Sequence, residues 1–313
     1  VDRIFARAMV HIILLLLGCL MIMTNSTYSN YRIENHKFKS MGITCDGDLY
    51  LPSNVEMPPI VVMAHGFGSE RVLRLPAYAE YFSQNGIAVF LFDYRGFGPS
   101  EGKPRNLVSP KHHIQDWANA IAYVRTLQNI DTNRIALWGS SYSGGHVLVT
   151  ASKEPNLAGI VAQVPFVDAG STVRRFKLSF ILKSAVHALW DGFKALFGAK
   201  PHNIKIVGLP NEFAALNTPD AWGGMLNLIP PGYDIEAANF CPARALMELI
   251  TYKPIKKAHK INCPVLIMGS KTDTLIDINA VRKTVKKISN CQFYEYECGH
   301  FDLYVGDLFE DSV

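Results

Sequence analysis

The sequence has 313 residues, of which 49% are hydrophobic, so the chain can bury a large core and does not have the composition of a disordered protein. Lysine and arginine number 31 against 27 acidic residues, which gives a formal net charge of only +4. This charge is spread along the chain, so it gives no electrostatic basis for a nucleic-acid partner. The balance is consistent with a small-molecule substrate.

The N-terminal segment has the pattern of a targeting sequence. Arg3 and Arg7 precede an apolar run over residues 8–23, and polar residues follow. This run is shorter than the roughly 20 residues of a transmembrane helix, which favours a signal peptide over a permanent span. We therefore expect residues 1–24 to be a signal peptide or membrane anchor, with the protein exported or anchored in a bacterial cell envelope. The alternative is a buried N-terminal helix of a cytosolic protein.

The six cysteines show no metal-ligand spacing. Cys19 ends a run that is similar to a bacterial lipoprotein cleavage box, so its lipidation is a further hypothesis. Cys291 and Cys298 bracket a predicted strand that would hold them roughly 20 Å apart, too far for a disulfide. The remaining three (Cys45, Cys241 and Cys263) are expected in the core or in loops, and a disulfide stays open if the protein is exported.

Short apolar runs that alternate with amphipathic helices predict a buried parallel sheet. Between the second and third runs, Ser109 and Pro110 mark the start of a helix with Trp117 and Ile121 on its apolar face. Helices of this kind cover both faces of a sheet. The predicted fold class is α/β, with a mostly parallel, doubly wound sheet. The predicted strands cover residues 60–64, 87–92, 134–138, 159–163 and 264–268.

The strand–helix alternation stops between residues 166 and 260. Phe176, Phe180, Leu189, Trp190 and other large apolar residues predict one or two helices there, and proline- and glycine-rich stretches follow. An insertion at this point would lie beyond the carboxyl end of a strand, where open α/β sheets bind ligands. We therefore predict a core of residues 40–165 and 261–313 with a helical cap insertion of residues 166–260. The alternative is that the aromatic residues only fill the core.

The segment Gly139-Ser140-Ser141-Tyr142-Ser143 lies between a predicted strand and a run compatible with a helix. Small residues two before and two after Ser141 let the chain turn sharply and expose the hydroxyl, as a nucleophile elbow requires. The usual motif has glycine where this chain has Ser143. Ser141 is therefore the candidate nucleophile.

A serine hydroxyl needs a base that an acid orients, and both residue types follow in a workable order. Asp273 lies in the loop after the predicted strand at residues 264–268, and His300 follows the last predicted strand. Asp277 is the alternative acid, and Asp302 is expected to be a local helix cap. The sequence therefore predicts a triad of Ser141, Asp273 and His300.

Backbone N–H groups must stabilise the oxyanion that forms when the serine attacks. Tyr142, directly after the nucleophile, supplies one, and Phe67 in the His65-Gly66-Phe67-Gly68 loop supplies the other. We expect His65 to stabilise this loop without acting as a catalyst. His112 and His113 are expected to form a solvated helix start.

These motifs, together with Asp93–Gly102 and Gly299–Asp302, resemble the α/β-hydrolase superfamily, in its bacterial branch of esterase-like and serine-peptidase-like hydrolases. The resemblance covers roughly residues 40 to 310. It implies an acyl-enzyme on Ser141, with His300 as general base and no metal or other cofactor. The expected substrate is a small molecule with an acyl group, in the form of a carboxylic ester. The alternatives are a serine peptidase or amidase, a thioesterase or acyltransferase, and a non-catalytic binding protein. Docking of the apolar cap on a membrane is a further hypothesis.

Overall fold

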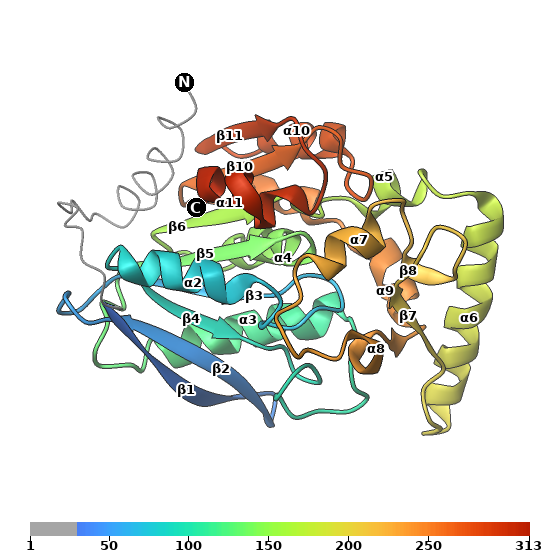
Figure 1. Ribbon diagram of the computed structural model, residues 1–313, viewed down its shortest axis with the longest axis horizontal. Helices are drawn as coiled ribbons and strands as arrows, with labels where there is room; N and C mark the ends of the chain where they lie inside the picture. Colours follow the sequence, from blue (N-terminus) through green and yellow to red (C-terminus); the bar gives the residue numbers. More distant parts are fainter. Residues whose placement is uncertain (1–29) are drawn as a thin grey trace.

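The computed structural model describes residues 30–313 (Figure 1). The predicted signal or anchor segment and Cys19 lie outside this range. Within it, no helix combines the length and the apolar character that a membrane span needs.

A twisted eight-stranded sheet forms the base of the molecule, in the order β1-β2-β4-β3-β5-β6-β10-β11. Six neighbouring strands run parallel, and β1 and β2 form an antiparallel hairpin at one edge. The predicted α/β class with a mostly parallel sheet is confirmed. The strands are β1 (Tyr31–Ser40), β2 (Ile43–Pro52), β3 (Ile60–Ala64), β4 (Ala88–Phe92), β5 (Ile135–Ser140), β6 (Gly159–Gln163), β10 (Val265–Ser270) and β11 (Cys291–Tyr296).

Helices cover both faces of this sheet, as a doubly wound fold requires. In Figure 1, α2 and α11 lie in front of the strands, and α3 and α4 lie behind them. The predicted cap at Ser109 is present, because its hydroxyl accepts a hydrogen bond from the N–H of His112. The helices of the base are α2 (Leu75–Gln84), α3 (Pro110–Val124), α4 (Tyr142–Ala151), α10 (Ile278–Val285), α11 (Gly306–Ser312) and the short 3₁₀ turn η3 (Asp302–Tyr304).

The segment predicted as a cap lies beyond the carboxyl ends of the strands, at the right in Figure 1. It is not wholly helical, because β7, β8 and β9 form a small three-stranded sheet that the sequence pattern did not predict. These strands have two to five residues, too few to show a period. The elements are α5 (Ala169–Val173), α6 (Leu178–Leu196), β7 (Asn203–Val207), β8 (Ala214–Leu216), α7 (Ala221–Leu226), α8 (Ile235–Ala238), β9 (Cys241–Pro242), α9 (Ala245–Thr251), η1 (Pro254–Lys256) and η2 (Ala258–Lys260).

The two ends of the cap segment are hydrogen-bonded to each other. The N–H of Ile255 donates to the carbonyl of Val167 at 3.0 Å, and that of Ala169 donates to the carbonyl of Tyr252 at 3.2 Å. The chain therefore leaves the base and returns to it at neighbouring points.

The hydrophobic core is centred on the parallel strands, where every residue of β3, β4, β5, β6 and β10 is buried. The five described cysteines are all free thiols, so the part of the chain from residue 30 onward contains no disulfide.

Candidate active site

Ser141 lies in a sharp turn between β5 and the first residue of α4. Its backbone has φ 58° and ψ −119°, a strained conformation for a residue other than glycine. A Cβ on Gly139 would lie 2.5 Å from the carbonyl oxygen of Ser143, so only glycine fits at that position. Ser143 occupies the place of the usual glycine, and its buried hydroxyl lies 3.1 Å from that of Tyr94. The departure from the motif is therefore accommodated by a hydrogen bond.

The structure brings the three predicted triad residues together in one chain of hydrogen bonds. Nε2 of His300 lies 2.9 Å from Oγ of Ser141, and Nδ1 of His300 lies 2.7 Å from Oδ2 of Asp273. His300 and Asp273 are buried at 2% and 6% exposure. In this geometry the imidazole can accept the proton of the serine hydroxyl while the carboxylate holds the ring in place.

The loop of Asp273 is held from both sides. Its Oδ1 accepts hydrogen bonds from the N–H groups of Leu275 and Ile276, both at 2.7 Å. Arg175, in the cap segment, donates to the backbone carbonyls of Asp273 and Ile276, both at 2.9 Å. Arg175 could not be predicted from the sequence, because nothing in its local pattern indicates a partner about a hundred residues away.

Asp277, the alternative acid, and Asp302 both make local structural contacts. Asp277 accepts a hydrogen bond from the N–H of Asn279 and caps α10. Asp302 accepts one from the N–H of Gly299 at 2.6 Å and so shapes the turn that carries His300. Asp277 is therefore a helix cap, whereas Asp302, expected to be one, stabilises the turn before its short helix.

The predicted oxyanion donors flank the nucleophile. Tyr142 is the first residue of α4, a position whose N–H has no acceptor within the helix. The loop that carries Phe67 packs directly on the elbow, since a Cβ on Gly66 would lie 3.5 Å from Cβ of Ser141. Both N–H groups therefore belong to segments that border the hydroxyl.

A buried ion-pair network supports the loop of Phe67. Arg71 contacts Asp93 at 2.5 Å, Asp46 at 2.7 Å and Asp48 at 2.8 Å, which ties the loop to β2 and to the end of β4. Burial raises the pKa of Asp93 to about 6, against the lowering effect of Arg71. His65 is buried beneath the same loop, and burial lowers its pKa to about 4. The buried Asp93 and His65 therefore fit a role in holding the loop of Phe67 in position.

His113 corrects one expectation. It is fully buried, whereas its neighbour His112 is partly exposed. Its ring stacks on Tyr94 with centroids 3.9 Å apart, and its Nδ1 lies 3.2 Å from Nε2 of His146. The expectation of a solvated pair was wrong for His113, because successive helix residues face different sides.

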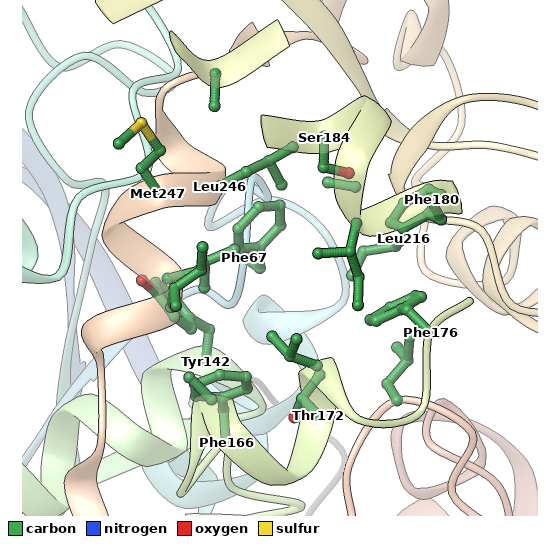
Figure 2. A pocket seen from close by; sticks show the side chains of 18 of the residues that line it. Phe67, Tyr142, Phe166, Thr172, Phe176, Phe180, Ser184, Leu216, Leu246 and Met247 are labelled. Carbon is green, nitrogen blue, oxygen red and sulfur yellow. The ribbon is translucent and has the colours of Figure 1, made fainter. Parts of the chain in front are cut away.

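A cavity of about 280 Å³ opens beside Ser141 between the base and the cap (Figure 2). Figure 2 shows Phe166 and Tyr142 on one side of it, with Ser184 of α6 and Met247 of α9 opposite. None of the described residues that line it carries a charge. A second, smaller cavity of about 40 Å³ lies on the His300 side of the nucleophile.

The described residues contain no cluster of side chains that could hold a metal ion.

The chain is similar to known proteins. The family model described as "serine aminopeptidase, S33" matches residues 56–202. The chain is 39% identical to the quorum-quenching protein AidA of Acinetobacter baumannii, over 88% of this chain and 90% of AidA. It is 38% identical to the thiohydrolase aneE of Aspergillus aculeatus, over 41% of this chain and 40% of aneE.

Solved structures show the same fold. The structure of DcsB in complex with its substrate analogue superimposes with a TM-score of 0.74 at 20% identity, and covers 89% of this chain and 95% of DcsB. The chain therefore belongs to the α/β-hydrolase superfamily, in the family that includes AidA.

Proposed function

We propose that this α/β hydrolase cleaves esters of aliphatic carboxylic acids through an acyl-enzyme on Ser141. The observation that carries the proposal is the hydrogen-bonded triad at the mouth of an uncharged, largely apolar cavity. A nucleophile in this position attacks a carbonyl whose acyl chain lies in the cavity.

The geometry supports a two-step reaction. Oγ of Ser141 attacks the carbonyl carbon as Nε2 of His300 takes its proton, and the N–H groups of Phe67 and Tyr142 stabilise the oxyanion. The tetrahedral intermediate collapses, and His300 returns the proton to the departing alcohol. Water, deprotonated by His300, then attacks the acyl-enzyme and releases the acid and the free serine. Asp273 keeps the imidazole oriented throughout.

The cavity favours an acyl group over a peptide. An aminopeptidase must bind a free α-amino group, for which a carboxylate is the natural partner, and none of the described residues that line the cavity is acidic. With about 280 Å³, the cavity is slightly smaller than the range of about 300–1,000 Å³ that is typical of ligand pockets. This size fits an aliphatic chain of medium length.

A thioester is the second candidate substrate. The apolar cavity would hold the acyl part of an ester or a thioester equally well, and the relative aneE is a thiohydrolase. The leaving group would lie in the small cavity beside His300, where space is narrow. An ester and a thioester share the acyl part, so these two candidate substrates differ only in the leaving group.

A substrate panel tests the proposal. We expect p-nitrophenyl octanoate to be hydrolysed with a higher kcat/KM than the acetate or the palmitate. Octanoyl-coenzyme A tests the thioester. An N-acyl homoserine lactone, which carries both a chain and an ester, is added because AidA is a quorum-quenching protein. Leucine p-nitroanilide tests the peptidase, and its preferential cleavage would contradict the proposal.

The nucleophile is tested with a fluorophosphonate probe. Ser141→Ala should lose labelling and lower kcat on the order of 10⁶-fold, because the whole triad loses its function. The neighbouring Ser143→Ala is the matched control and should keep labelling and kcat within about tenfold, since it removes only a hydroxyl that lies 3.1 Å from that of Tyr94. Labelling that persists in Ser141→Ala would refute the assignment.

A further inference from the structure

Helix α6 presents a band of apolar side chains to solvent, here called the α6 stripe. Exposed fractions range from 52% for Trp190 to 81% for Leu196. Together these side chains expose on the order of 1,000 Å² of apolar surface, whereas the largest patch on a typical monomer has about 300–600 Å². A surface of this size marks an interaction site. The stripe consists of Leu178, Leu182, Val186, Leu189, Trp190, Phe193, Leu196 and Phe197.

The protein's own contacts hold the stripe outward. On the opposite side of α6, the carboxylate of Asp191 is buried and accepts hydrogen bonds from the N–H of His202 at 2.7 Å and of Arg244 at 3.0 Å. Ala188 is buried on that inner side as well. Rotation of the helix would break these bonds and leave a buried carboxylate without partners. Within residues 30–313, the stripe is therefore left open to a partner.

We propose that a second copy of this chain covers the α6 stripe, so that two α6 helices pack antiparallel about a two-fold axis. Five of its residues (Leu182, Val186, Leu189, Phe193 and Leu196) follow each other at spacings of four, three, four and three. This heptad seam is typical of a helix that pairs with another helix, whereas a helix that lies on lipid needs only a broad apolar face.

The area agrees with a homodimer. A stable interface buries about 800 Å² on each partner, and the stripe alone supplies that amount. A two-fold axis uses the same surface twice, so one self-complementary helix face is sufficient.

The seam also predicts a register. With the axis at Leu189, Leu182 of one copy faces Leu196 of the other, and Phe193 faces the small Ala185. Large side chains opposite small ones let two helices interdigitate. Lys183 stays outside the seam, because its Nζ lies over the ring of Phe213, 4.7 Å from the centroid.

Such a dimer would complete the wall of the acyl cavity, a consequence that rests on the proposed function. Leu189 belongs to the stripe and also lines the cavity, and the lining residues Met247 and Ile250 are 43% and 53% exposed. These three residues therefore border both the cavity and the solvent. The second copy would cover their exposed side.

Sedimentation velocity of the full chain tests the dimer without reference to activity. We expect a species of about 70 kDa, twice the 34.8 kDa of one chain. Leu182→Glu/Leu196→Glu should sediment as a monomer, because four carboxylates would meet in an apolar seam. Ile33→Glu, at a 51% exposed isoleucine on β1, is the matched control and should remain dimeric. Circular dichroism checks that each variant is folded.

Three outcomes would overturn the proposal: a monomeric wild type, a dimer that survives the double substitution, or an Ile33→Glu monomer. A flotation experiment with phosphatidylglycerol vesicles tests lipid as the alternative partner. If the wild type floats with the vesicles and the double variant does not, the stripe binds lipid and the proposal is overturned.

Cysteine cross-linking tests the register. Leu189→Cys lies on the proposed axis, so mild oxidation should link two copies within minutes, while Ile33→Cys and the wild type, with its own cysteines, should not be linked. Equal linking of all three proteins would contradict the antiparallel pair.

Discussion

The base and the cap use apolar residues in opposite ways. In the base, five strands are buried along their whole length, and the loops at their ends hold the triad within hydrogen-bond distance. In the cap, the apolar residues of α6 either line a cavity or face solvent. The base therefore holds the hydrogen-bonded triad, while the cap presents apolar side chains to the cavity and to solvent.

The largest expected effect concerns the base. Asp273→Asn should lower kcat about 10⁴-fold, because the amide no longer holds the imidazole in the required tautomer. Asp277→Asn is the control, since this residue caps α10 and lies outside the triad. Steady-state kinetics with p-nitrophenyl octanoate measures both variants, and equal losses would remove the distinction between the two acids.

A change in the cap should alter selectivity and leave the chemistry intact. Ala188→Phe places a ring in the cavity and should lower kcat/KM for octanoate by about 10- to 200-fold, while acetate hydrolysis changes little. Ala195→Phe, on the exposed side of the same helix, is the control. If Ala188→Phe lowers kcat/KM equally for the acetate and the octanoate ester, the cavity does not hold the acyl chain.

Loss of the contact between Arg175 in the cap and the loop of Asp273 in the base should have a smaller effect. Arg175→Ala removes two charged hydrogen bonds to the loop of Asp273 and should lower kcat about tenfold with little change in KM. Arg175→Lys should restore part of the loss. The exposed neighbour Arg174 gives the matched alanine control. A change confined to KM would indicate that Arg175 acts on substrate binding.

A further expected effect concerns the stability of the base and leaves the reaction chemistry aside. Burial lowers the pKa of His65 to about 4, that of His146 to about 3 and that of His113 well below its usual value. Each histidine therefore takes up a proton on unfolding once the pH falls below about 6.5, and the stability present above that pH is lost toward pH 4.

His146→Asn tests this pH dependence. Between pH 6 and pH 4, its free energy of unfolding in urea should fall less steeply than that of the wild type, by about 1.4 kcal/mol per pH unit. The exposed His259→Asn should leave the slope unchanged. Parallel slopes for the wild type and His146→Asn would show that His146 does not contribute.

The sequence predicts the base well because its signals are local. Buried parallel strands are uninterrupted apolar runs, and the elbow at Ser141 requires small neighbours, so both can be recognised from the sequence. The β1–β2 hairpin could not be recognised in this way, because most of β1 is partly or fully exposed and carries polar residues. The sheet begins at Tyr31, whereas the core was predicted to begin at residue 40.

The small sheet of the cap and the supporting contacts could not be predicted, because they depend on partners distant in the sequence. Arg71 reaches Asp46 and Asp93, and Arg175 reaches Asp273, each across a separation that no local pattern reveals. The position of Phe67 beside Ser141 followed only from the expectation that a loop after an early strand meets the elbow.

The joined ends of the cap have an evolutionary consequence. Since the chain departs near Val167 and returns near Ile255 through paired backbone hydrogen bonds, the intervening segment resembles a replaceable cassette. Recombination could exchange it between relatives while the reaction centre stays assembled. An incoming cassette would need to bring its own counterpart of Arg175, or the recipient would inherit a new substrate range with a weakened catalyst.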